Sequence, residues 1–272
     1  MQRDAPVLPV TSSTEPAWAV EARSCYRDVV AALHEGQVEC AVGGAFAIHK
    51  HTGIWRTTKD LDLLLEARSV PNALDQLRHA GFETCIEDPV WLAKAFRGDY
   101  FVDLITGLGN ASLRVDASWI ERSSREEILG VPCRILAPEE MIASKVFVAR
   151  RERFDGSDVV HLIRACGERL DWARLLHILD RHWQLLLWSL SLFAYVYPGR
   201  TELVPERIWT ELMNRFTESV KHPQRDAAFR GSLIDPLMFA IDVNEWGERN
   251  LYREYCENHP DLLVQGAEDC SE

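Results

Sequence analysis

The chain has 272 residues, of which 47% are hydrophobic and 26% charged, and these values are ordinary for a folded globular protein. This apolar content excludes disorder over most of the chain, because disordered proteins lack the side-chain area to build a core. The 42 acidic and 30 basic residues give a formal net charge of −12. Such a charge argues against duplex DNA as a partner, since that attraction depends on Lys and Arg.

The cysteines and the apolar stretches bear on the cellular compartment. The chain has 7 cysteines, widely scattered and without a C-x-x-C pair, which argues against a disulfide framework and a zinc cage. The N-terminal residues contain no apolar run preceded by positive charge, so they predict no secretory signal. The most apolar stretch, 183–197, is interrupted by polar residues and is shorter than the about 20 residues that cross a bilayer. We therefore expect a cytoplasmic protein with reduced thiols and no membrane partner.

Predicted elements alternate between helix and strand in the first half of the chain. Residues 1–17, rich in Pro, Ser and Thr, predict a flexible arm. Hydrophobic periodicity and glycine positions then predict, in chain order, a helix over 18–33, a strand over 38–42, a helix over 45–50, a strand over 57–65, a helix over 71–80, and strands over 90–96 and 100–105 joined by a hairpin turn.

The pattern changes near Pro138, after which strand signals nearly vanish and helical periodicity dominates. The predicted helices cover 139–151, 157–165, 171–182, 183–197 and 205–219. The resulting domain hypothesis has a domain over 18–137, a helical domain over 138–257 that would bind a substrate or partner, and an acidic tail over 258–272.

Three acidic residues lie on predicted strands. Asp60 and Asp62 are two residues apart on the strand 57–65, so both side chains leave the same face. Asp103 lies in the middle of the apolar strand 100–105, where a carboxylate is costly without a cationic partner. If the two strands are neighbours, the three carboxylates converge.

Converging carboxylates require cations. Two carboxylates 4 Å apart repel each other by about 4 kcal/mol at an effective dielectric constant of 20. Hard oxygen ligands select Mg²⁺ or Mn²⁺. Two such ions, about 3.5–4 Å apart, would stabilise the attacking and leaving oxygens of an in-line phosphoryl displacement.

A pair of glycines precedes the acidic strand. Gly43-Gly44 follow the strand 38–42 and precede a helix, so bare backbone N–H groups lie at the positive end of that helix. The absence of Cβ atoms allows a phosphate to approach closely. Together with the acids, the glycines predict a site for a nucleoside triphosphate and two metal ions.

At these residues the sequence resembles the nucleotidyltransferases of the DNA polymerase β superfamily. Their pattern is a Gly-Gly or Gly-Ser turn, an Arg-x-Thr-x-Asp-x-Asp strand and a third acid on a later strand. Arg56, Thr58, Asp60 and Asp62 match the strand, and Asp103 matches the third acid. The resemblance implies an α+β fold, with a mixed-sheet nucleotidyltransferase palm and helices followed by an all-helical C-terminal domain.

The resemblance also implies an activity. The enzyme would transfer a nucleoside monophosphate from an NTP to an acceptor and release pyrophosphate. Asp60, Asp62 and Asp103 would hold two Mg²⁺ or Mn²⁺ ions, and Asp103 would also help to deprotonate the acceptor. Gly43 and Gly44 would hold the triphosphate.

Within the superfamily the chain is most similar to the bacterial minimal nucleotidyltransferases that include the AbiEii-like toxins. Their helical half opens on a Pro-Glu-Glu segment followed by a lysine and an Arg- and Asp-rich motif, here 138–140, Lys145 and 150–158. In that family the lysine contacts nucleotide phosphates and the final acids shape the site, which implies these roles for Lys145 and Asp158. The chain departs from the pattern at Ala45, where many members have a hydroxyl, and in having Phe154 before Asp155 instead of Arg.

Simpler interpretations exist for single residues. Asp99 and Asp116 are alternative third acids, but a hairpin turn and a helix cap explain them more simply. Lys145 on a helix is by default a solvated charge. Asp158 at a helix start favours the helix dipole without any catalytic role.

The acceptor stays open between the 3′ end of a tRNA, a protein hydroxyl and a small molecule such as an antibiotic. A small-molecule acceptor predicts a closed pocket between the domains, and RNA predicts an open positive cleft. The rival hypothesis is a catalytically silent nucleotide-binding or interaction module of a defence or toxin–antitoxin system, with a cognate protein partner. A two-metal phosphohydrolase would usually have His ligands among the acids, and none are present in the motif.

Overall fold

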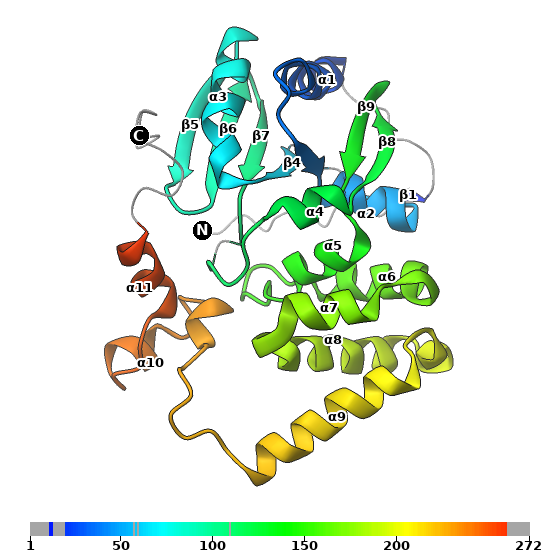
Figure 1. The fold of residues 1–272 in the computed structure, drawn as a ribbon, viewed down its shortest axis with the longest axis vertical. Helices are drawn as coiled ribbons and strands as arrows, with labels where there is room; N and C mark the ends of the chain where they lie inside the picture. The colour runs from blue at the N-terminus through cyan, green and yellow to red at the C-terminus, as the bar shows by residue number, and fades with distance from the viewer. Residues whose placement is uncertain (1–10, 13–19, 57, 59, 109, 260–272) are drawn as a thin grey trace, which may run out of the picture.

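A mixed seven-stranded sheet forms the first half of the chain in the computed structural model, which describes residues 11–12, 20–56, 58, 60–108 and 110–259 (Figure 1). The strand order is β5-β6-β7-β4-β2-β9-β8. The pairs β4–β7 and β2–β9 are parallel, and the other pairs are antiparallel. The strands are β2 (Cys40–Val42), β4 (Asp60–Leu65), β5 (Glu83–Asp88), β6 (Leu92–Arg97), β7 (Tyr100–Ile105), β8 (Ser124–Ile128) and β9 (Val131–Ile135). A second, two-stranded sheet pairs β1 (Thr11–Ser12) with β3 (Ile54–Trp55).

Four helices of the described chain accompany the sheet: α1 (Val20–Glu35), α2 (Gly44–Thr52), α3 (Val70–His79) and α4 (Ala117–Glu121). Helices α1 and α3 contact each other and the sheet, and α1 buries its apolar residues at helical spacing. Helix α2 begins directly after β2 and ends at Gly53, whose φ of 73° is the left-handed conformation that ends many helices. This short connection places the start of α2 beside β4.

The second half of the described chain is helical. It comprises α5 (Pro138–Lys145), α6 (Gly156–Cys166), α7 (Trp172–Leu179), α8 (Trp183–Val196), α9 (Glu206–Lys221), α10 (Ala240–Asn244) and α11 (Leu251–Asn258). Helices α5 to α9 form a stack below the sheet in Figure 1. After α9 the chain returns to the sheet, where the Tyr252 hydroxyl donates a 2.6 Å hydrogen bond to Asp88.

The observed fold confirms the predicted α+β class with a helical C-terminal region. A single cluster of buried apolar side chains runs from α1 to α9, so the sheet and the helical region share one core. The boundaries 18–137 and 138–257 stay a prediction. Residues 1–10, 13–17 and 260–272, from the predicted arm and acidic tail, lie outside the described residues.

Several predicted elements need correction. The strands β5, β8 and β9 were not predicted, and β8 gave no alternating signal because four of its five residues are exposed. The helix predicted over 139–151 ends at Lys145, because the chain turns back and Arg150 accepts and donates backbone hydrogen bonds with Arg153. Helix α6 begins at Gly156, one residue before the predicted start of the helix 157–165. Asp116 caps α4 by accepting a hydrogen bond from the Ser118 N–H, as the simpler interpretation predicts.

Two sequence-based expectations concern the compartment. None of the described helices is both long and apolar enough to cross a bilayer. Cys25, Cys40, Cys133, Cys166 and Cys256 are free, as expected.

Candidate active site

The structure brings the three predicted carboxylates together. Strands β4 and β7 are parallel neighbours, and their register places Asp62 directly opposite Asp103. Because side chains alternate along a strand, Asp60 leaves the same face as Asp62. One carboxylate oxygen of each acid lies within 4.8 Å of the others. The convergence inferred from two separate segments is thus present in the folded chain.

The electrostatics of these acids reflect their crowding. Burial, together with the carboxylates of Asp60 and Asp103, raises the pKa of Asp62 to about 7. Burial also raises the pKa of Asp103 to about 6, although the ammonium group of Lys94 opposes the rise. Without a bound cation, Asp62 and Asp103 therefore release their protons at a pH closer to neutral than an ordinary aspartate does.

The glycine pair allows α2 to start against the acidic strand. The Gly43 N–H donates a 2.9 Å hydrogen bond to the backbone carbonyl of Asp62. Gly44 has a φ of +53°, and a Cβ added to it would lie 2.7 Å from Cγ of Asp62 and closer still to Oδ2. Only glycine tolerates both this conformation and this contact. A glycine is therefore needed at position 44 to leave room for the Asp62 carboxylate. Its lack of a Cβ also allows a phosphate to approach the backbone.

Thr58 contacts one of the three acids of the site, whereas Arg56 contacts helix α6. The Thr58 hydroxyl donates a hydrogen bond to the Asp60 carboxylate and accepts one from the Asp60 N–H, so it orients this acid. The Arg56 guanidinium instead forms an ion pair with Asp158 and donates a 3.4 Å hydrogen bond to Ser157. Arg56 thus links the segment before β4 to helix α6.

Lys145 lies at the centre of a buried ionic cluster. Its Nζ is 2.9 Å from carboxylate oxygens of both Asp155 and Asp158, and Arg153 donates two further 2.9 Å hydrogen bonds to Asp155. Burial opposes the charge of Lys145, but the two carboxylates outweigh it and raise its pKa. Lys145 is only 9% exposed, so the interpretation of a solvated lysine is wrong.

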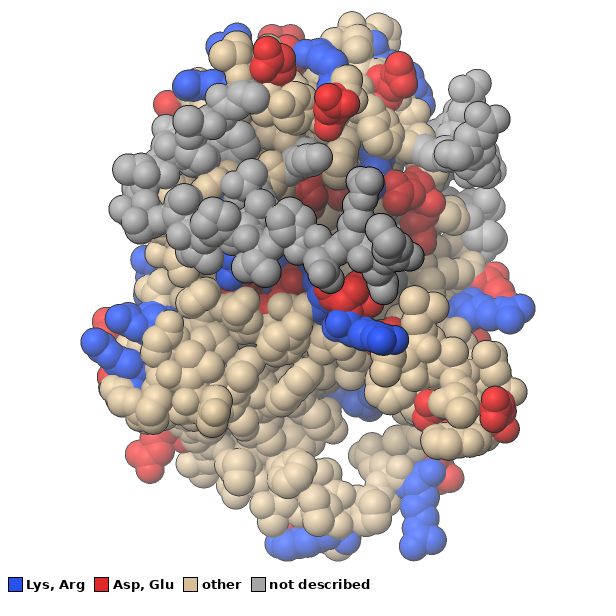
Figure 2. Space-filling view, turned by 180° about the vertical axis from the view of Figure 1, so that it is seen from behind, with Lys and Arg blue, Asp and Glu red and all other residues tan. Residues whose placement is uncertain are grey.

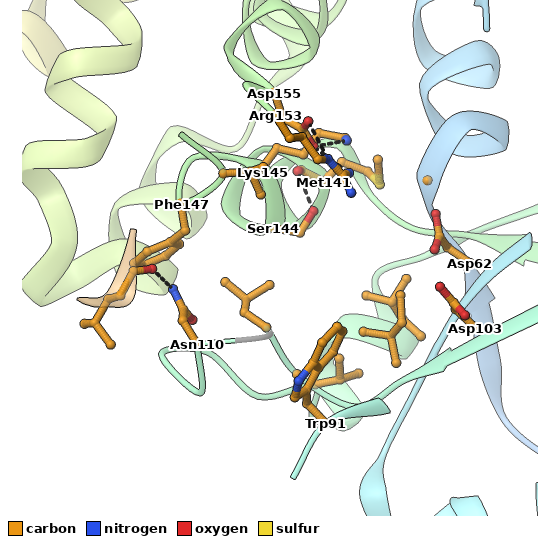
Figure 3. A pocket seen from close by; sticks show the side chains of 18 of the residues that line it. Asp62, Trp91, Asp103, Asn110, Met141, Ser144, Lys145, Phe147, Arg153 and Asp155 are labelled. Carbon is orange, nitrogen blue, oxygen red and sulfur yellow. Dashed lines mark hydrogen bonds and ion pairs between the residues drawn. The ribbon is translucent and has the colours of Figure 1, made fainter. Parts of the chain in front are cut away.

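A cavity of about 260 Å³ separates the ionic cluster from the acids. In Figure 3, Lys145, Arg153 and Asp155 stand on one side of this cavity, and Asp62 and Asp103 stand on another. One wall of the cavity therefore carries the carboxylates of Asp62 and Asp103, whose negative charge is not fully balanced by nearby cations. Another wall carries the ionic cluster around Lys145, whose positive and negative charges are paired.

Sequence reasoning missed Lys94. Its Nζ lies 3.6 Å from Oδ1 of Asp103 and 2.8 Å from Glu87. The sequence contained a signal for this pair. A hairpin turn at residues 98–99 sets the antiparallel register of β6 and β7, and that register places Lys94 opposite Asp103. A lone lysine in an otherwise apolar strand needs such an acidic partner.

Comparisons with solved structures find weak similarities. The antibiotic-resistance factor ANT(2'')-Ia is 17% identical, with 65% of this chain and 99% of that chain covered and a TM-score of 0.45. An antigenic nucleotidyltransferase-like protein from Paracoccidioides brasiliensis is 16% identical, with 68% and 93% covered and a TM-score of 0.41. The Megavirus polyadenylate synthase is 14% identical, with 56% and 33% covered and a TM-score of 0.40. Scores this low carry no weight for the function of the site.

A family model gives the decisive comparison. None of the curated proteins matches the chain. Residues 22–182, more than half of the chain, match the family described as "Nucleotidyl transferase of unknown function (DUF2204)". The matched region contains the whole seven-stranded sheet, the three acids and the ionic cluster around Lys145. The chain belongs to this family and is a nucleotidyltransferase.

Proposed function

We propose that the enzyme transfers a nucleoside monophosphate from an NTP to an acceptor hydroxyl, with divalent cations held by Asp60, Asp62 and Asp103. The observation that carries the proposal is the approach of three carboxylate oxygens to within 4.8 Å of one another beside the glycine turn. Carboxylates at such distances are expensive to ionise without a cation. Metal dependence is therefore what this arrangement supports best.

The residues present suit Mg²⁺ or Mn²⁺. The donors are all carboxylate oxygens, which hard cations prefer. Oδ1 of Asp103 is buried and accepts no hydrogen bond within 3.5 Å from any described residue, although the Lys94 ammonium group lies 3.6 Å away. When bound, the cations would neutralise the charge that develops on the transferred phosphoryl group and its leaving oxygen.

The remaining roles fall to the chain's own groups. The backbone N–H groups at the start of α2, after Gly43 and Gly44, would bind the triphosphate, and Lys145 lines the same cavity as Gly44. The acceptor oxygen would form a bond to the α-phosphorus while the bond to the β-phosphate oxygen breaks and pyrophosphate leaves. The hydroxyl proton would pass to the carboxylate of Asp103, and Thr58 would keep Asp60 in place.

The finer features of the hypothesis differ in the support that they have. Similarity to the AbiEii-like toxins rests on Lys145, Asp158 and the segment before them, and the ion pairs of these residues agree with a role in shaping the site. The cytoplasmic location, the two-domain boundaries and a cognate protein partner stay predictions. A silent nucleotide-binding module stays the rival to an active enzyme.

Replacement of one acid tests the proposal. The wild type, Asp62→Asn and the control Asp116→Asn are each incubated with α-labelled NTP, Mg²⁺ and a cell extract, and labelled product and pyrophosphate are measured. We expect the wild type and Asp116→Asn to form product, since Asp116 only caps α4, and Asp62→Asn to form none. Near-normal activity of Asp62→Asn would refute the metal assignment. Binding of Mg-NTP by the wild type without any turnover would support the silent module.

A further inference from the structure

The cavity beside the acids continues into an apolar compartment. We call this the inner compartment and define it by Trp91, Leu108, Asn110, Phe147 and Leu233. In Figure 3, Asn110 and Phe147 stand across the cavity from Asp62 and Asp103. Apart from Asn110, these side chains offer apolar or aromatic surface.

A segment from the far end of the chain closes this compartment. Residues 231–239, here called the closing segment, follow α9 and contribute Leu233 to the wall. Asn110 Nδ2 donates a 2.6 Å hydrogen bond to the Leu233 carbonyl. The buried Asp235 carboxylate accepts a 3.1 Å hydrogen bond from the Arg151 N–H. These bonds hold the segment against both the sheet loops and the helical region.

The sheet topology indicates which reactant lies in the inner compartment. The glycine turn follows β2, and Asp103 lies in β7, so the two flank β4 on opposite sides. In phosphoryl transfer the attacking and leaving oxygens are roughly in line, on opposite sides of phosphorus. With the triphosphate at the glycine turn, the acceptor must approach from the β7 side. Leu108 and Asn110 follow β7, and Trp91 precedes the adjacent β6.

We propose that the inner compartment binds the acceptor, and that the acceptor is a small uncharged molecule carrying a hydroxyl on an apolar body. This inference rests on the proposed function, because the direction of approach follows from the triphosphate position. The acids among the described residues that line the cavity are Asp62, Asp103 and Asp155. Asp155 is already paired with Lys145 and Arg153. Apart from the proposed catalytic acids Asp62 and Asp103, the described lining residues therefore offer no unpaired carboxylate that could bind a polycation.

Size and surface charge favour a small molecule over RNA. The cavity of about 260 Å³ lies near the lower end of small-molecule sites, which are about 300–1,000 Å³. The chain carries a formal net charge of −12, and on the face in Figure 2 the described basic side chains are interspersed with acidic ones and form no continuous basic surface. RNA binding depends on such a surface.

Ile234 allows a test that leaves the catalytic acids intact. Its side chain lines the cavity from the closing segment and is half-buried, so a longer polar side chain there need not disrupt the core. Ile241, on α10, is 46% exposed and is not among the lining residues. Ile234→Glu and Ile241→Glu therefore form a matched pair.

The experiment measures two ligands by calorimetry on the full chain. Mg-NTP is titrated first into the wild type and both variants. β-Naphthol, a neutral aromatic alcohol, and spermine, a polycation, are then titrated in the presence of Mg-NTP. We expect Mg-NTP to bind all three proteins equally, β-naphthol to bind the wild type and Ile241→Glu, and Ile234→Glu to weaken β-naphthol about tenfold or more, because the new carboxylate must stay hydrated.

The outcomes separate the two proposals. Failure of the wild type to bind Mg-NTP would overturn the proposed function itself. Loss of Mg-NTP affinity in Ile234→Glu alone would assign the compartment to the nucleotide and overturn this inference only. The inference also fails if β-naphthol does not bind, binds Ile234→Glu as tightly as the wild type, or binds less tightly than spermine. Labelling of RNA or protein instead of small molecules in the extract assay would contradict it as well.

Discussion

Gly44 at the start of α2 packs directly against the carboxylate of Asp62, so that a Cβ at Gly44 would lie 2.7 Å from Asp62 Cγ. The left-handed φ of Gly44 makes any other residue costly there as well. The turn thus sets the position of the central acid, and the two features that the sequence presents as separate motifs form one structural unit.

Gly44→Ala should therefore lose activity by about a hundredfold or more, because displacement of a reacting group by about 1 Å can cost that much. The control is Gly53→Ala, at the other end of α2. Gly53 also has a positive φ, 73°, but its added Cβ would meet nothing within 4 Å. Both variants should lose about 1–2 kcal/mol of stability from backbone strain, measured by urea unfolding. Equal activities of the two variants would show that the Asp62 contact is unimportant.

The stability of the metal-free protein should fall as pH rises from about 4 to about 7. The pKa values of Asp62, about 7, and Asp103, about 6, exceed the ordinary value of 3.8. Between these limits the folded chain holds protons that the unfolded chain has released, so the free energy of unfolding decreases with pH. Asp62→Asn removes one such proton site. Its Tm in EDTA should exceed that of the wild type by a few degrees at pH 8 and by less at pH 5.5.

Mg²⁺ should stabilise the wild type more strongly as the pH rises, whereas the metal-free protein loses stability over the same pH range. Ionised carboxylates bind the cation, so Mg²⁺ should raise the Tm more at pH 8 than at pH 5.5. A Tm difference between Asp62→Asn and the wild type that is the same at both pH values would contradict the assigned pKa shifts.

Lys94 places a fixed positive charge beside one proposed metal ligand, since its Nζ lies 3.6 Å from Asp103 Oδ1. Lys94→Met removes the repulsion between this charge and a bound cation, so Mn²⁺ should bind about threefold to tenfold more tightly at pH 8. Paramagnetic resonance of free Mn²⁺ measures this without turnover. Lys50→Met is the control, because Lys50 pairs with Glu126 on β8. Weaker Mn²⁺ binding in Lys94→Met would mean that Lys94 mainly holds Asp103 in position.

Lys145→Met should destabilise the fold by about 1–3 kcal/mol, because Asp155 and Asp158 lose their shared buried cation and keep only Arg153 and Arg56 as partners. Lys221→Met is a matched control with an equally short ion pair, 2.9 Å to Glu218, but on the exposed surface of α9. Such a pair contributes about 0–1 kcal/mol. Urea unfolding in EDTA gives both values. A cost below about 1 kcal/mol for Lys145→Met would show that the cluster is solvated.

The local pattern was sufficient to predict the acids and their neighbours. Alternation on one strand places Asp60 and Asp62 on the same face, and an apolar strand around Asp103 predicts burial; both follow from residues close in sequence. The strand predicted over 100–105 matches β7 residue for residue. The strand β8 could not be predicted in this way, because its exposed residues carry no pattern.

The sequence by itself thus determined the α+β class with a helical C-terminal region and the alternation that places Asp60 and Asp62 on one face, because hydrophobic periodicity and residue spacing are local properties. Only the tertiary structure decided what surrounds the acids. Lys145 is buried between two carboxylates, and the Asn110 side chain meets the Leu233 carbonyl 123 residues further along the chain. Contacts across such separations depend on how whole elements pack, which no local pattern records.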